Sequence, residues 1–195
     1  RFVSAGRMRE GDTFPVFARI HGRKGSLSGE MEFSDLPDSD VSGSDLLWIR
    51  PDLSRSPRYP EGWPNGILVD AVGTLFGPPE SLDFGQGPPD PDNGNAALQF
   101  SDAGLPDLVV HQVSVDPATG RLLRVPIRSR DCFPRLNRRN GLLNGRFRLE
   151  DGRLAPFRGV LLNKGANQGG FGYFVTPGPD SEGGGVSLVP ATGEE

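Results

Sequence analysis

The sequence is poor in several residues that commonly stabilise small proteins or catalyse reactions. Among its 195 residues are one cysteine, Cys132, two histidines, and two lysines against nineteen arginines. A single cysteine excludes an internal disulfide framework and a thiolate cage for zinc. No run of about 18 apolar residues is present, so the sequence predicts no helix that spans or inserts into a membrane.

Glycine and proline, by contrast, are unusually frequent. The 28 glycines and 19 prolines make up about a quarter of the chain, well above average usage. Because both residues disrupt helix interiors, a helix bundle and a coiled coil are excluded. Hydrophobic residues still form 35% of the sequence, and 12 phenylalanines can fill a core. The composition therefore predicts a folded protein without long helices.

Apolar and polar residues alternate with a period of two through most of the sequence, which is typical of strands. Strands are expected at residues 14–20, 30–33, 46–49, 67–76, 96–100, 108–115, 121–127, 146–149, 154–162, 171–176 and 185–189. Loops are expected at residues 34–45, 77–95 and 128–140. Short strands separated by turn residues predict an all-β fold, either an antiparallel β-barrel or a closed two-sheet sandwich.

The length suits one domain. We predict a single β domain over residues 1–190 and a loose tail over residues 191–195. Because Arg1 lies inside a segment that reads as a strand, we expect the chain to be a piece of a longer protein.

A short internal similarity leaves a second organisation open. Residues 25–33 and 141–149 both read Gly-x-Leu-x-Gly followed by alternation. Such a pair is expected from a duplicated half-barrel, with halves at residues 1–107 and 108–190, or from the same turn chemistry arising twice.

The charges are unevenly distributed along the chain. Residues 1–120 hold nine basic and eighteen acidic residues, whereas residues 121–158 hold eleven arginines and three acidic residues. The net charge of −4 argues against a nucleic-acid partner. The arginine-rich region suits a polyanion such as an acidic polysaccharide. The alternative is a set of solvated strand faces paired with the acidic part of the chain.

One acidic segment resembles the first half of a calcium-binding loop. Asp38, Asp40 and Ser42 stand at positions 1, 3 and 5, a glycine follows at position 6, and Asp45 adds another oxygen. The glutamate expected at position 12 is missing, since Ile49 stands there. Calcium is therefore the one cofactor that the sequence suggests, and an acidic surface turn is the alternative.

Few residues suit catalysis. A serine nucleophile needs a base, and only His21 and His111 offer an imidazole. Each lies in or beside a predicted strand, and Cys132 lies in the arginine-rich loop as a lone thiol. We expect a non-enzymatic protein, with a hydrolase as the remaining alternative.

Two aromatic residues are candidates for glycan binding. Tyr59 and Trp63 lie beside prolines and a glycine in a predicted loop, where exposed rings could stack on sugars. Trp48 lies within an apolar run, so we expect it in the core.

Five segments together resemble a β-rich repeat module of large secreted or surface-anchored multidomain bacterial proteins, and they occur in the same order there. They are residues 14–29 (FPVFARIHGRKGSLSG), 47–51 (LWIRP), 59–63 (YPEGW), 157–162 (FRGVLL) and 170–174 (GFGYF). Two positions depart from the pattern, since His21 replaces the usual aromatic residue and Glu30 replaces the usual tryptophan.

The resemblance implies export, an extracellular or cell-surface location, and partners that are neighbouring modules or copies of the same chain. It supplies no catalytic or ligand-binding residues. From the sequence we expect a structural or adhesive module of an exported bacterial surface protein. A glycan- or polyanion-binding module that takes an extracellular polysaccharide is the alternative.

Overall fold

The computed structural model describes residues 7–54, 56, 59–78 and 80–191. The strand expected around Arg1 and residues 192–195 of the expected tail lie outside this range. The described residues form twelve β-strands and three single-turn 3-10 helices, with no α-helix among them. This confirms the predicted all-β class. No helix within these residues has the length and apolar character needed to cross a membrane.

The chain divides into two compact units, unit 1 at Arg1–Leu75 and unit 2 at Phe76–Glu195. The halves 1–107 and 108–190 meet inside unit 2, so their boundary differs from the unit boundary. The two similar segments fall on one strand of each unit, β2 (Gly25–Phe33) and β9 (Leu142–Arg148), and both strands are paired on either side.

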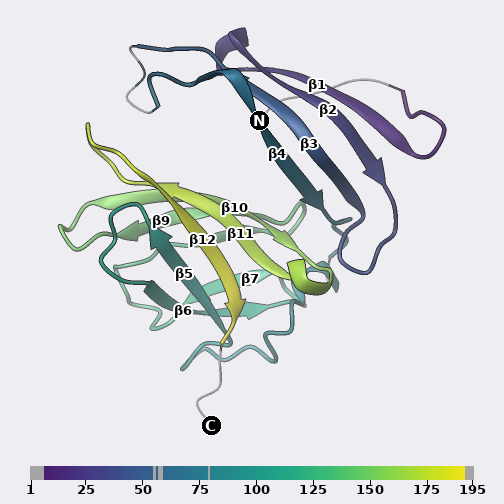
Figure 1. Ribbon diagram of the computed structural model, residues 1–195. Helices are drawn as coiled ribbons and strands as arrows, with labels where there is room; N and C mark the ends of the chain where they lie inside the picture. Colours follow the sequence, from purple (N-terminus) through teal and green to yellow (C-terminus); the bar gives the residue numbers. More distant parts are fainter. Residues whose placement is uncertain (1–6, 55, 57–58, 79, 192–195) are drawn as a thin grey trace. The chain divides into compact units, whose positions relative to one another are not determined.

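Unit 1 is a four-stranded antiparallel sheet in which consecutive strands are neighbours (Figure 1). Its strands are β1 (Thr13–Ile20), β2 (Gly25–Phe33), β3 (Val41–Arg50) and β4 (Trp63–Gly73). The β3–β4 register shifts between Gly43 and Leu46 and again between Trp48 and Arg50. β3 also begins earlier than predicted, because its first residues belong to the segment 34–45 that the polar composition marked as a loop.

Unit 2 is one eight-stranded antiparallel sheet with the order β7-β6-β5-β12-β11-β10-β9-β8. Its strands are β5 (Ala96–Asp102), β6 (Val109–Asp116), β7 (Arg121–Arg124), β8 (Arg135–Asn137), β9 (Leu142–Arg148), β10 (Leu154–Leu162), β11 (Gly169–Val175) and β12 (Gly183–Pro190). The end strands β7 and β8 approach each other without a ladder of hydrogen bonds in the described chain. The sheet is therefore a nearly closed barrel.

One local prediction in unit 2 was wrong. β8 lies within the segment 128–140 that was predicted as a loop, and the sequence did not show this strand because three residues are too few for a period of two.

The hairpin loop between β9 and β10 contains an Asp-Gly pair at residues 151–152. Leu149 N–H donates to the Arg153 carbonyl, which leaves a three-residue loop, and Gly152 has a φ of +84°. This is the hairpin loop that places glycine in the left-handed conformation.

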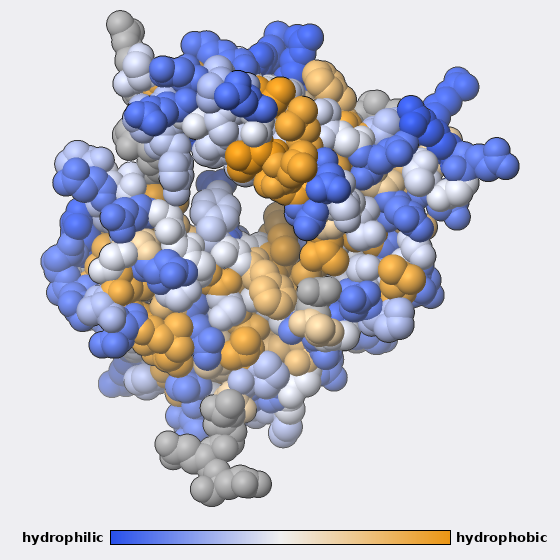
Figure 2. All heavy atoms as spheres, in the orientation of Figure 1, coloured by the Kyte–Doolittle hydropathy of each residue, from blue (hydrophilic) through white to orange (hydrophobic). Residues whose placement is uncertain are grey.

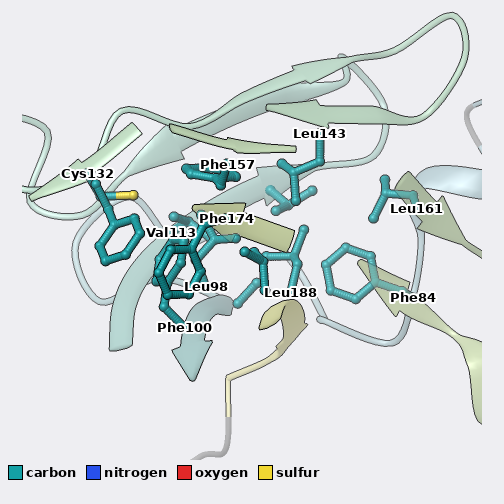
Figure 3. Close-up of a cluster of buried hydrophobic side chains, with 14 of the residues drawn as sticks. Phe84, Leu98, Phe100, Val113, Cys132, Leu143, Phe157, Leu161, Phe174 and Leu188 are labelled. Carbon is teal, nitrogen blue, oxygen red and sulfur yellow. The ribbon is translucent and has the colours of Figure 1, made fainter. Parts of the chain in front are cut away.

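Four phenylalanine rings form the centre of the unit 2 core (Figure 3). Phe100 stacks on Phe147 with centroids 3.9 Å apart, and Phe157 and Phe174 meet Phe100 edge-on at 5.2 and 5.9 Å. Aliphatic side chains from β5, β6, β9, β10 and β12 surround the rings. They are Leu98, Val113, Val115, Leu143, Leu161, Val186 and Leu188.

Glycines on neighbouring strands make room for two of these rings. Gly145 is the register partner of Phe157, and Gly184 is the partner of Phe174. A Cβ on Gly145 would lie 2.6 Å from the Phe157 ring, and one on Gly184 would overlap the Phe174 ring. Each ring thus occupies space that the side chain of any residue other than glycine would fill at position 145 or 184.

The proline- and glycine-rich segment 77–95 packs against the same core. Its single-turn helix η2 (Glu80–Leu82) buries Leu82, and Phe84 follows it into the core. The buried side chain of Gln86 holds this segment by bonding to the Leu82 carbonyl and to the Phe84 N–H. The loop prediction for 77–95 was therefore right about its irregular backbone but missed its share in the core.

We predict that Gly184→Ala lowers the free energy of unfolding by about 1–3 kcal/mol, because the added methyl group overpacks the Phe174 ring. Gly185→Ala is the matched control on the opposite face of β12, where a Cβ would meet the rotatable Ser101 hydroxyl at 3.1 Å and Asp102 Oδ2 at 3.8 Å. Urea unfolding followed by far-UV circular dichroism measures both. Equal losses in the two variants would contradict the role of Gly184.

Candidate functional site

Tyr59 and Trp63, the two residues suggested for glycan binding, lie together in unit 1. Their ring centroids are 6.0 Å apart with an interplanar angle of 66°. The Tyr59 side chain is 61% exposed, and Trp63, at the start of β4, is half-buried. The pair therefore offers one exposed ring above a more firmly held one.

The backbone of residues 59–62 sets this arrangement. Gly62 N–H donates to the Tyr59 carbonyl at 3.0 Å and closes a turn with Pro60 at its second position. Gly62 has a φ of +59°, and a Cβ there would lie 2.5 Å from the carbonyl oxygens of Arg50 and Pro51. Only glycine allows this close passage, which brings Trp63 directly beside the end of β3.

Trp48 and Arg50 extend the site from β3. They are two residues apart on an extended strand, so their side chains share one face. Trp48 meets Trp63 edge-on with centroids 4.9 Å apart. The Arg50 guanidinium lies 5.5 Å from the Trp63 centroid and 5.9 Å from the Tyr59 centroid, within cation–π range of both. It also donates to the Ser56 hydroxyl at 2.9 Å.

His21 completes the row at the turn between β1 and β2. Its Nε2 accepts a hydrogen bond from Trp48 Nε1 at 3.3 Å, and the two ring planes are parallel within 2°. A Cβ on Gly25 would overlap the Ile49 carbonyl oxygen and lie 3.0 Å from the imidazole, so glycine is needed here too. Burial, and secondly the positive charge of Arg50, hold the pKa of His21 below its usual value.

We call His21, Trp48, Arg50, Tyr59 and Trp63 the aromatic cluster. Its rings present apolar faces, the buried Arg50 guanidinium packs against two of them, and its tyrosine reaches solvent. Such a surface suits a ligand that has both an apolar face and hydroxyl groups, because the rings can stack while the polar groups bond. A sugar ring has this character.

The sequence reasoning missed two members of the cluster and expected another in the core. Trp48 is half-buried and packs within the row. Arg50 was not singled out, and His21 was considered only as a possible catalytic base. The available signal was the two-residue spacing between Trp48, on the predicted strand 46–49, and Arg50 directly after it, because period-two alternation places both on the face that Trp63 joins.

The four residues suggested for calcium lie along the start of β3. Asp38 and Asp40 precede the strand, whereas Ser42 and Asp45 belong to it. Asp40 accepts from Leu75 N–H, and Asp45 N–H donates to Asp70 Oδ1 at 3.1 Å. No group of three or more His, Cys, Asp or Glu side chains that could hold a metal occurs in the part of the chain that the structure describes. Calcium binding here stays a prediction.

The other residues considered for catalysis lie in unit 2. His111, half-buried on β6, meets the Phe100 ring edge-on at 5.9 Å. Cys132, expected as a loop thiol, is buried in the core, and its backbone forms an isolated antiparallel β-bridge with that of Phe147. Burial raises the pKa of Cys132 to about 12, although Arg124 opposes this shift. The arginine-rich region therefore does not activate this thiol.

Some arginines of the region 121–158 pair within that region. Arg148 lies 3.6 Å from Asp131, and Arg153 lies 2.6 Å from Asp151. These short-range pairs involve acidic residues of the same region rather than the acidic first part of the chain.

Comparisons of this chain with protein-family models, with curated proteins and with solved structures gave no match.

We predict that tryptophan emission falls as His21 becomes protonated. Protonated Nε2 can no longer accept from Trp48, and both tryptophans of the chain belong to the aromatic cluster. Because the pKa of folded His21 is lowered, the midpoint lies below 6.5, and unit 1 loses stability as the pH falls below that value. A pH titration of emission tests this. His21→Phe keeps a ring at this position and is expected to abolish the transition, so a transition that persists would contradict it.

Proposed function

We propose that this chain is a non-enzymatic adhesive module of an exported bacterial surface protein, and that the aromatic cluster binds a glycan. One observation carries the proposal. Tyr59 and Trp63, suggested from the sequence, lie in contact, and Arg50 and Trp48 support them from the neighbouring strand.

The geometry favours stacking over deep enclosure of a ligand. Tyr59 is the outermost ring of the row, and its exposed face can receive the C–H face of a sugar. Trp63 packs against both Trp48 and the Arg50 guanidinium, so little side-chain freedom is lost on binding. A repeating polysaccharide fits such a site, because a shallow aromatic surface does not require a chain end.

Export and a surface role are supported by the resemblance to modules of secreted bacterial proteins. Two of the segments that carry this resemblance, 47–51 and 59–63, contain Trp48, Arg50, Tyr59 and Trp63. The resemblance and the proposed site thus depend on the same part of unit 1. His21 departs from the pattern, yet it lies beside Trp48 and accepts a hydrogen bond from the indole N–H.

We predict that the chain retains members of an immobilised panel of neutral glycans, and that each retained oligosaccharide changes tryptophan emission on titration. Tyr59→Ala and Trp63→Ala are each expected to weaken binding about tenfold, the loss expected for a ring that anchors an interface. Tyr59→Phe keeps the stacking ring and is expected to retain most of the affinity. Isothermal calorimetry measures the variants.

Tyr173→Ala is the control for this experiment. Tyr173 is the other tyrosine of the chain, is 57% exposed and lies in unit 2. Retention of neutral glycans that survives both Tyr59→Ala and Trp63→Ala, or no retention at all, would rule out the aromatic cluster as the site.

A purely structural module is a second candidate, because the sheet of unit 1 has two open edges. The outer edges of β1 and β4 pair with no other strand among the residues that the structure describes. Apolar residues interrupt a mostly hydrophilic surface (Figure 2), and Leu68 on β4 is 62% exposed. Open edges are the usual route by which sheets join neighbouring modules or copies.

If the edges join copies, the mass in solution should rise with protein concentration, and Leu68→Lys should lower it, since a charge on an edge strand opposes pairing. Leu75→Lys, at an exposed position after the end of β4, is the control. Light scattering measures the mass, and repeating it with calcium tests the segment that holds Asp38 and Asp40. A mass that stays monomeric at every concentration would remove this candidate.

A further inference from the structure

A second surface with binding character lies in unit 2, on the outer face of β8, β9 and β10. Arg135, Arg146 and Arg158 contribute one arginine from each strand to an open groove of about 570 Å³. Asn144 lies among them, and the chain at Gly145 and Gly159 also lines the groove. The volume is within the range of small-ligand sites.

The strand register places these side chains on one face. Asn144 is the partner of Arg135 on β8 and of Arg158 on β10, so the two arginines lie about 10 Å apart, two strand spacings. Arg146 is two residues beyond Asn144 on β9 and points to the same side. The three guanidinium groups therefore surround one amide.

The charges of these three arginines are not balanced by an ion pair in the described part of the chain. Arg148 and Arg153 form ion pairs, whereas Arg135, Arg146 and Arg158 form no side-chain hydrogen bond or ion pair within the described residues. All three are exposed. Three unpaired positive charges held side by side by strand pairing attract an anion, and a guanidinium can bind a carboxylate or sulfate through two parallel hydrogen bonds.

The same row continues to an exposed aromatic ring. Tyr173 on β11 is the register partner of Arg158, and its side chain is 57% exposed. Register partners across the sheet are therefore, in order, Arg135, Asn144, Arg158 and Tyr173. Such an order offers charge, a hydroxyl-binding amide and a stacking face in sequence.

We propose that this groove binds an acidic polysaccharide through the carboxylate or sulfate groups of its sugars. Arg135, Arg146 and Arg158 bind the anionic groups, Asn144 bonds to hydroxyl groups between them, and Tyr173 stacks on the next sugar along the row. The site lies in unit 2 and does not depend on the glycan proposed for the aromatic cluster of unit 1.

A polysaccharide fits these residues better than a protein or a nucleic acid. A stable protein interface buries about 800 Å² on each side around an apolar centre, whereas three arginines bring unpaired positive charges to this groove, beside the apolar side chains of Leu142 and Pro156. A single strand of nucleic acid stacks successive bases on several aromatic side chains, whereas Tyr173 is a single ring at the end of this row.

The test is calorimetry of the whole chain with polygalacturonate, which carries carboxylates, and with dextran sulfate. Methyl-esterified polygalacturonate is the uncharged counterpart. We expect binding to at least one acidic polymer, no binding to the ester, and weaker binding as salt is raised. The triple variant Arg135→Gln, Arg146→Gln, Arg158→Gln should lower the affinity about tenfold or more.

A matched triple variant separates the groove from general charge. Arg121→Gln, Arg128→Gln and Arg139→Gln remove the same charge from exposed arginines of the region that do not line the groove. We expect this variant to change the affinity less than about twofold, since screening limits effects beyond about 10 Å. Arg158→Lys keeps the charge but loses the two-bond geometry, so an intermediate loss is expected.

The unaltered protein gives an independent readout. Phenylglyoxal modifies accessible arginines, and bound polymer should protect Arg135, Arg146 and Arg158 more than Arg121, Arg128 and Arg139. Tryptophan emission should not change on binding, and Trp63→Ala should bind the acidic polymer normally, because both tryptophans lie in unit 1.

Several results would overturn the proposal. They are equal losses in the two triple variants, equal protection of all six arginines, or equal binding of a single-stranded oligonucleotide. A self-association that only the groove variant abolishes would show that a second copy occupies the groove. Binding lost in Trp63→Ala but kept in the groove variant would place the acidic ligand at the aromatic cluster instead.

Discussion

The fit of phenylalanine rings over glycines is the constraint on which unit 2 depends. Phe157 and Phe174 are register partners on adjacent strands, and each faces a glycine on its other side, Gly145 or Gly184. A ring needs lateral room that a sheet of ordinary residues does not leave, and a sheet must coil strongly to become a barrel. The positions of Gly145 and Gly184 therefore have one physical cause, because the rings of Phe157 and Phe174 each require a gap on the next strand.

Unit 1 uses its aromatic residues differently. Its tryptophans and His21 lie in a row at one end of a four-stranded sheet, half-buried, with Arg50 among them. Glycine again allows the close approach, since Gly25 admits the imidazole and Gly62 admits the carbonyl groups at the end of β3. In unit 2 the rings face one another and exclude solvent, whereas in unit 1 the last ring of the row faces outward. The same steric device thus yields a core in one unit and a surface in the other.

Most of the fold could be predicted from the sequence because a strand with one buried face alternates apolar and polar residues. The elements that were not predicted have physical reasons. β8 is too short to show a period, the polar start of β3 looked like a loop, and the segment 77–95 buries Leu82 and Phe84 without regular structure. Tyr59 and Trp63 could be named because loop aromatics stand out. The groove arginines could not, since their grouping depends on the pairing of β8, β9 and β10, which no local pattern encodes.

The position of β12 has a consequence for how the chain assembles. This last strand lies between β5 and β11 and joins two hairpin-connected groups, β5 to β7 and β8 to β11, into one sheet. Its pairing with β5 links residues more than 80 positions apart, as in Gly184 with Asp102. Such long-range contacts slow folding. During synthesis the two groups keep unpaired edges until residues 183–190 have been made. In unit 1, by contrast, each strand after the first pairs with the strand made just before it.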